Sequence, residues 1–289
     1  MKKGEEQKTV VPAVPATREI MPGVQVCADA ESVARAAARY FVECAWQSIG
    51  KDGRFNVALS GGRTPEALFR LLASPEFRAQ VDWGRVEVFW GDERAVPPES
   101  KESNYGVARR ELLIRVPIPG ANVHRMEAEK ANIGRAAQDY EDLLREKLPL
   151  DSRGFPRFDL IYLGMGTEGH TASLFPGVRG TRETSRWVST PLVPKIASRR
   201  MTLTLPVLNA AQRVMFLIAG EEKAEILFTV LAGKSDPPLP AQLVTVPDGK
   251  RIMLCDEAAA KLVMEDIAAN GHFTGKRITG AAHLKKSKH

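Results

Sequence analysis

One histidine of the five in this chain lies in a turn rich in glycine, where it could act as a general base. His170 belongs to the segment 164–177, GMGTEGHTASLFPG, which follows an apolar run at 158–163 that is typical of a buried strand. We expect a short helical turn to begin here, and its positive end would help to keep the imidazole neutral, the form that accepts a proton. Glu168 could share the same pocket. A histidine that merely packs the turn is the alternative.

A second segment, SGGRTP at 60–65, is suited to bind an anion. It follows the apolar run 55–59, and its paired glycines let backbone N–H groups approach a ligand closely. We predict that Thr64 caps a helix and that Pro65 opens it, which would aim the positive helix end at the same place. An ordinary strand-to-helix turn is the alternative. The segment lacks the Gly-Lys-Ser/Thr ending of a P-loop and the third glycine of a dinucleotide fingerprint.

Charged residues follow two more predicted strands. Asp92, Glu93 and Arg94 come directly after the run 86–90, and we interpret them as a loop that supplies an orienting carboxylate and an anion-binding guanidinium. Arg200 and Lys223 are lone basic residues near strand ends. A solvated loop is the alternative for each of these charges. Glu168 and Asp92 could in principle hold a metal, but no His-x-x-x-His or similar spacing supports a metal site.

The elements that must position these residues alternate between strand and helix. We expect helices over residues 29–47, 64–73, 105–113, 133–148, 221–231 and 258–267, and strands over residues 55–59, 86–90, 160–163, 201–205, 214–219 and 252–254. This alternation predicts one α/β domain, a doubly wound, mostly parallel sheet with helices on both faces. Ligands bind at the carboxyl ends of such strands, so the unusual loops should meet in one crevice.

Composition narrows the class of protein further. The chain of 289 residues carries a net charge of +6 and three widely spaced cysteines, which fits a reducing cytoplasm. Neither a membrane span, a secretory signal nor a nucleic-acid-binding pattern is apparent. We expect a mobile arm at 1–23, the domain at 24–270 and a basic tail at 271–289, in a monomer or weak homodimer.

Taken together, these motifs resemble the 6-phosphogluconolactonase family. The resemblance rests on residues 60–65, 90–94, 103–105, 164–177, 200–205 and 220–223, in this order, and covers about residues 24–267. It implies the fold of glucosamine-6-phosphate deaminase and ribose-5-phosphate isomerase, a phosphosugar lactone substrate, and no metal or organic cofactor. Two positions depart from the family pattern. Arg63 replaces a small residue, and Thr167-Glu168 replaces Pro-Asp, which puts the role of Glu168 in doubt.

The resemblance implies hydrolysis of 6-phospho-D-glucono-1,5-lactone to 6-phospho-D-gluconate, with His170 activating water. Asp92 would orient His170 or a neighbouring basic group, and Arg94 or backbone N–H groups near Gly169 would stabilise the oxyanion. The residues that we expect to hold the substrate are Ser60, Gly61, Gly62, Arg63, Thr64, Gly169, Arg200 and Lys223.

Two other functions remain as alternatives. An amino-sugar-phosphate isomerase or deaminase would carry an aromatic residue in place of Arg94, and an acidic residue where this chain has Leu174-Phe175-Pro176. A sugar-phosphate sensor of a transcription regulator would carry a helix-turn-helix, for which the segment before Val24 is too short.

Overall fold

The computed structural model describes residues 17–193 and 198–276. Within these residues, a seven-stranded sheet has the strand order β1-β2-β11-β10-β6-β3-β4. Its neighbouring strands are parallel, except that β1 and β2 are antiparallel. The strands of this sheet are β1 Arg18–Met21, β2 Val24–Cys27, β3 Phe55–Leu59, β4 Val86–Trp90, β6 Leu160–Leu163, β10 Arg213–Ile218 and β11 Lys250–Asp256.

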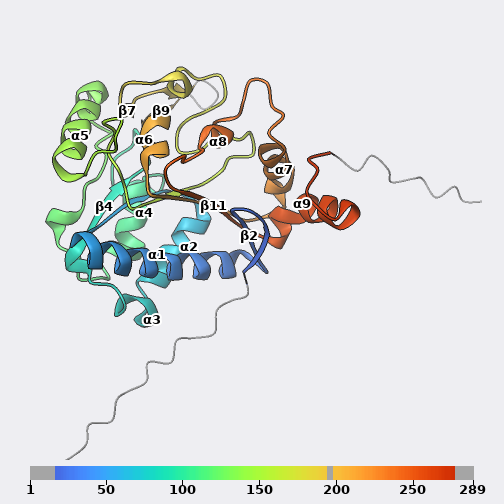
Figure 1. The fold of residues 1–289 in the computed structure, drawn as a ribbon. Helices are drawn as coiled ribbons and strands as arrows, with labels where there is room; N and C mark the ends of the chain where they lie inside the picture. The colour runs from blue at the N-terminus through green and yellow to red at the C-terminus, as the bar shows by residue number, and fades with distance from the viewer. Residues whose placement is uncertain (1–16, 194–197, 277–289) are drawn as a thin grey trace, which may run out of the picture.

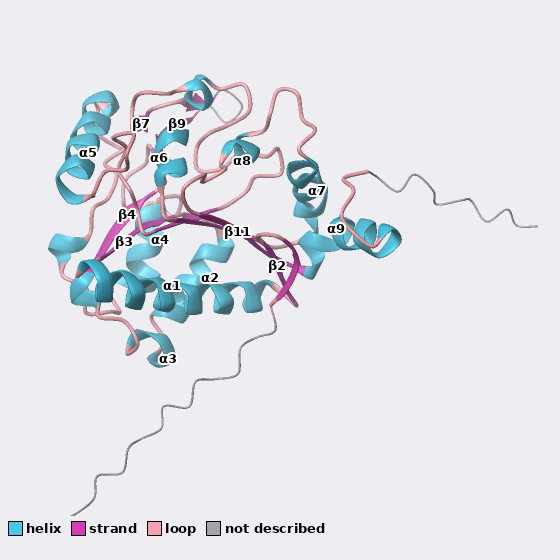
Figure 2. Cartoon of the chain, viewed as in Figure 1, coloured by secondary structure: helices cyan, strands magenta, loops and turns pink. Residues whose placement is uncertain are grey.

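Helices cover both faces of this sheet, as the sequence predicts. Helices α1 and α2 lie below the sheet in the view of Figure 1, whereas α6 and α8 lie above it. Figure 2 shows the magenta strands between these two helical layers. The α-helices are α1 Ala30–Asp52, α2 Arg63–Leu72, α3 Pro75–Arg78, α4 Asn104–Ala108, α5 Ile133–Lys147, α6 Leu205–Ala210, α7 Ala224–Ala232, α8 Pro240–Leu243 and α9 Glu257–Asn270. Where the structure describes the chain, none of these helices is long and apolar enough to span a bilayer.

The central strands form because they are apolar on both sides. Every residue of β3 and of β6 is buried, as expected for strands that are covered by helices on both faces. The predicted strands 55–59, 86–90 and 160–163 are confirmed. The strands predicted at 214–219 and 252–254 form at β10 and β11, which begin earlier.

A second, smaller sheet lies outside this frame. Its four strands are β5 Asp92–Arg94, β7 Val188–Ser189, β8 Leu192–Val193 and β9 Ser198–Leu203. Strand β9 pairs antiparallel with each of the other three. The prediction of a loop at Asp92–Arg94 is therefore wrong, because pairing with β9 extends these residues. The strand predicted at 201–205 is β9, shifted by two or three residues toward the N-terminus.

Several helix ends differ from the prediction. The first helix continues beyond residue 47 to Asp52. Its C-cap is Gly53, whose φ of 77° is left-handed. Helix α2 begins at Arg63, so Gly62 is its N-cap and the expectation of a Thr64 cap is wrong. Gly62 has a φ of 113°, a backbone conformation that residues other than glycine rarely adopt. Pro65 still lies in the first turn, where its missing N–H costs nothing.

Two predicted helices have irregular turns. The helix expected at 105–113 is α4 followed by a π-helical turn, Arg109–Leu113. The helix expected at 221–231 starts with a 3₁₀ turn, Glu221–Lys223, before α7.

The ends of the described chain are partly ordered by hydrogen bonds. Strand β1 lies within the arm predicted at 1–23 and pairs with β2, so that part of the arm is a strand. Thr274 and Gly275 lie in the predicted tail, and their backbone N–H groups donate to Asp266 Oδ2 over 2.7 and 3.0 Å. The remaining parts of the arm and tail, 1–16 and 277–289, lie outside the described residues.

Candidate active site

The candidate site lies where the direction of the sheet changes. From β3 the chain first adds β4 on one side and then β6 on the other, so the loops that follow β3 and β6 leave a crevice between them. A cavity of about 350 Å³ opens there. Nine residues that the sequence singled out line it: Ser60, Gly61, Gly62, Arg63, Thr64, Asp92, Arg94, His170 and Lys223. Gly169, Glu168 and Arg200 do not line it.

His170 has a fixed position in this cavity. Its ring stacks on Phe175, with 4.2 Å between the ring centroids. Its Nδ1 lies 3.2 Å from Glu168 Oε1, within ion-pair range, but has no well-aligned hydrogen bond. Burial lowers the pKa of His170, and Lys223 acts in the same direction, while Glu168 and Asp92 oppose the shift. Burial therefore favours the neutral ring, which is the form that accepts a proton.

The cause of this neutrality differs from the one expected. Residues 164–178 contain turns and no helix, so the prediction of a helical turn beginning at His170 is wrong. The turn is closed by hydrogen bonds from Gly166 N to His170 O and from Gly169 N to Gly166 O, each 2.9 Å long. A Cβ on Gly166 would lie 2.0 Å from His170 Nδ1, so only glycine leaves room for the ring. Burial, rather than a helix dipole, lowers the pKa of the imidazole.

Gly169 does not have the role that the sequence suggested. Its N–H donates to Gly166 O, and its carbonyl accepts from Ala241 N over 3.0 Å. The N–H is therefore engaged within the turn in this structure and is not directed at an oxyanion. Its φ of 82° and the side chain of Leu239 beside it explain instead why this position is glycine.

Asp92 is buried and held by side chains that the sequence reasoning gave no role. Its Oδ2 accepts from Ser173 Oγ over 2.7 Å, and its backbone carbonyl accepts from Asn104 Nδ2 over 2.8 Å. Asn104 also lines the cavity. A Cβ on Gly61 would lie 1.8 Å from Asn104 Oδ1, so the glycine turn makes room for this asparagine. Asp92 has no hydrogen bond to His170 and acts on it through its charge.

Glu93, between Asp92 and Arg94, has a structural role. Its carboxylate accepts hydrogen bonds from the backbone N–H groups of Arg94, Asn104 and Tyr105 and from the Ser103 hydroxyl. Burial raises the pKa of Glu93, and these hydrogen bonds oppose that shift. The carboxylate ties strand β5 to the first turn of α4 and so fixes both Asp92 and Asn104.

Two arginines face each other across the pair of strands β5 and β9. Arg94 is the register partner of Arg200, and the buried Nε of each guanidinium has no hydrogen-bond partner within the described structure. Burial lowers the pKa of Arg200, and the charge of Arg94 lowers it further. Unpaired donors on adjacent cations favour an anion nearby. Only Arg94 reaches the cavity itself.

The loop 60–65 adds the first turn of α2 to this cationic region. The first N–H groups of a helix have no partner inside the helix, and the end they form is partly positive. Lys223 also lines the cavity, and it forms no ion pair within the part of the chain that the structure describes. Arg63 points away, with its side chain 91% exposed and paired with Glu222 over 2.8 Å. Its backbone belongs to the loop, but its charge lies at the rim.

A cationic cavity that holds a half-buried histidine with a lowered pKa, at the switch point of a parallel sheet, defines an α/β protein with a site for small anions. Comparisons with known proteins narrow this class. A family model described as "Glucosamine-6-phosphate isomerases/6-phosphogluconolactonase" matches residues 28–253. The chain belongs to this family.

Relatives and solved structures agree with this assignment. A 6-phosphogluconolactonase of Synechocystis is 38% identical over 216 residues, which are 74% of this chain and 87% of the relative. A probable chloroplastic 6-phosphogluconolactonase 4 of Oryza sativa is 36% identical over 242 residues, 81% of this chain and 74% of the relative. The solved 6-phosphogluconolactonase of Trypanosoma brucei, 29% identical, has a TM-score of 0.76 and covers 84% of this chain and 99% of its own. A monomeric glucosamine-6-phosphate deaminase, 20% identical with a TM-score of 0.69, covers 84% and 100% and shares the fold.

Proposed function

We propose that this chain hydrolyses 6-phospho-D-glucono-1,5-lactone to 6-phospho-D-gluconate, a step of the oxidative pentose phosphate pathway. The observation that carries the proposal is the position of His170, whose pKa burial lowers, inside a cavity whose other charges are largely cationic. Relatives that carry the name 6-phosphogluconolactonase support the same reaction.

The phosphate would bind where donors are unpaired. Arg94, Lys223 and the first turn of α2 all line the cavity, and together they offer a guanidinium, an ammonium and backbone N–H groups. Ser60 and Thr64 contribute hydroxyl groups from the same loop. Arg200 would contribute its charge from outside the cavity. It is the register partner of Arg94 on β9 but does not line the cavity. Binding the anion here places the lactone ring toward His170.

His170 would then act as the general base. It takes a proton from a water molecule, the resulting hydroxide attacks the lactone carbonyl, and a tetrahedral oxyanion forms. When the bond between the carbonyl carbon and the ring oxygen breaks, the imidazolium returns the proton to that oxygen. Water is consumed, and the products are one free hydroxyl and one carboxylic acid, which releases its proton to the solvent and becomes the carboxylate. Asp92 stabilises the transient imidazolium by its charge.

The deaminase alternative is weaker at this site. That class would carry an acidic residue shortly after the histidine, but here Phe175 covers the imidazole ring at 4.2 Å. Glu168 lies on the preceding side of the turn, beside Nδ1. The carboxylate needed to relay protons during isomerisation is therefore replaced by an apolar ring.

Hydrolysis of freshly prepared 6-phosphogluconolactone by the purified chain tests the proposal. We expect a rate well above the spontaneous opening of the lactone, and no ammonia release from glucosamine 6-phosphate. Ammonia release without lactone hydrolysis would instead favour the deaminase reaction.

We also propose a reducing, cytoplasmic location and a monomer or weak homodimer. All three cysteines are buried and free, as is usual in a reducing compartment. Fractionation of the native cells and sedimentation of the pure protein would test these two points separately.

A further inference from the structure

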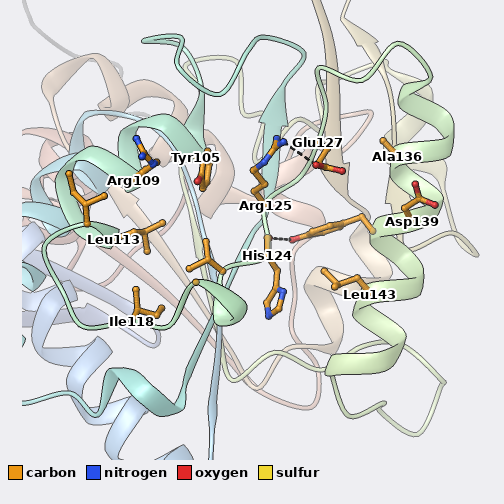
Figure 3. Close-up of a pocket in the computed structure, with 14 residues that line it drawn as sticks. Tyr105, Arg109, Leu113, Ile118, His124, Arg125, Glu127, Ala136, Asp139 and Leu143 are labelled. Atoms are coloured by element: carbon orange, nitrogen blue, oxygen red, sulfur yellow. Dashed lines mark hydrogen bonds and ion pairs between the residues drawn. The ribbon is translucent and has the colours of Figure 1, made fainter.

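A second cavity lies away from the catalytic one and shares no lining residue with it. Its volume of about 540 Å³ exceeds the 350 Å³ of the catalytic cavity. Figure 3 shows Tyr105, Arg109 and Leu113 on one side of it and Leu143 of α5 on the other, with His124 between them. We name it the helix cavity. Its volume is in the range of small-molecule sites, about 300–1,000 Å³.

The floor of the helix cavity is apolar. Leu113, Ile118, Val123 and Leu143 line it together with the ring of Tyr140. The Tyr140 hydroxyl accepts from Trp90 N over 3.1 Å and donates to His124 O over 3.3 Å. Because the backbone already satisfies this hydroxyl, Tyr140 offers the cavity only its ring. Such a floor suits a flat, apolar body.

The charges around the helix cavity leave one cation available. Arg125 pairs with Glu127 and Glu129 over 3.0 and 2.8 Å, and Asp139 pairs with Arg135 over 2.8 Å. Arg109 is exposed at the rim and has no ion-pair partner within residues 17–193 and 198–276. The acidic residues are thus neutralised locally, and the unpaired charge that remains among the lining residues is positive.

The wall that carries Arg109 has an unusual backbone. Ile114 N donates to Arg109 O over 3.2 Å, the spacing of a π-helical turn. Such turns are rare and occur frequently at functional sites. This turn places Arg109 and Leu113 on the same cavity, one as cation and one as apolar contact.

We propose that the helix cavity binds a small organic monoanion with a planar apolar body and one carboxylate, sulfonate or phosphate group. The body lies on the floor between Leu113 and Leu143, and the anionic group pairs with Arg109. This inference is independent of the reaction proposed above, because the two cavities share no residue.

Fluorescence titration with 1-anilinonaphthalene-8-sulfonate, an anion of this shape, tests the proposal on the full chain. We expect saturable binding that excess 6-phosphogluconate does not displace. Arg109→Glu should weaken the binding about tenfold or more, whereas the matched control Arg110→Glu, with an exposed neighbouring arginine, should leave it unchanged. Ala136→Trp, which fills the cavity from α5, should abolish the binding.

Three results would overturn the proposal: no saturable binding, displacement of the probe by 6-phosphogluconate, or equal affinities of the two arginine variants. If Ala136→Trp fails to fold, the comparison of Arg109→Glu with Arg110→Glu still tests the proposal, because both arginines are exposed and their replacement should not disturb folding.

Discussion

The two sides of the catalytic cavity are built in different ways. The basic side consists of Arg94, Lys223 and the loop 60–64. Arg94 Nη1 donates to Glu102 O, but the buried Nε of Arg94 has no partner within the described residues. The histidine side consists of His170 and Asp92, which are locked in place by Phe175 and Ser173. Unpaired donors can bind an anion, whereas side chains held by packing and hydrogen bonds are preorganised for proton transfer. Substrate binding and proton transfer are therefore assigned to different side chains of one cavity.

Removal of the histidine should have the largest effect. His170→Ala removes the base and should lower kcat for lactone hydrolysis roughly 10²-fold or more, with little change in KM. His272→Ala is the matched control, because His272 is exposed and outside the cavity. Steady-state assays at saturating lactone measure the effect. A kcat for His170→Ala equal to that of the control would remove His170 from the mechanism.

Removal of the Arg94 guanidinium should change KM more than kcat. Arg94→Ala takes a charged donor from the anion site and should raise KM about tenfold or more. Its effect on kcat should be smaller than that of His170→Ala. Arg54→Ala, an exposed arginine just before β3, is the control. Substrate titrations of both variants measure the effect, and an unchanged KM in Arg94→Ala would contradict the anion site.

The pH dependence should reveal the influence of Glu168 on the histidine. Burial keeps the pKa of His170 below its ordinary value. Activity should therefore be lost only at a pH below the ordinary pKa of histidine, where the ring becomes protonated. Glu168 raises this pKa. Glu168→Gln should therefore move the acidic limb of the kcat/KM profile to lower pH, whereas Glu146→Gln, at an exposed helix position, should not move it. A shift to higher pH would contradict the assigned interaction.

The smallest effect is expected at the rim. Arg63 is 91% exposed and paired with Glu222, and exposed ion pairs contribute about 0–1 kcal/mol. Arg63→Ser should change KM by less than about fivefold. Glu222→Gln breaks the same pair and serves as its control. A loss in Arg63→Ser as large as that in Arg94→Ala would move Arg63 into the anion site.

The sequence predicted the frame of the molecule because local patterns determine it. Strands β3 and β6 are continuous apolar runs, and the loops that follow them meet at one edge of the sheet wherever parallel strands pair. The crevice and most of its lining could therefore be predicted from residue types and order. The family resemblance supplied the substrate.

The details that failed depend on contacts between distant residues. Asp92–Arg94 form a strand only because β9, a hundred residues later, pairs with them, and this pairing sets Arg94 beside Arg200. The cap of α2 depends on the backbone angle of Gly62. The Gly169 N–H is used inside its own turn, which a motif does not reveal. Asn104 and Ser173, which hold Asp92, lie in segments that carry the family resemblance, but residue types alone do not reveal that they contact Asp92.

The most direct test of the separation between the two sides is a parallel determination of kcat and KM for His170→Ala and Arg94→Ala with 6-phosphogluconolactone. We expect kcat to fall in His170→Ala while KM changes little, and Arg94→Ala to affect mainly KM. Losses confined to the same parameter in both variants would contradict it.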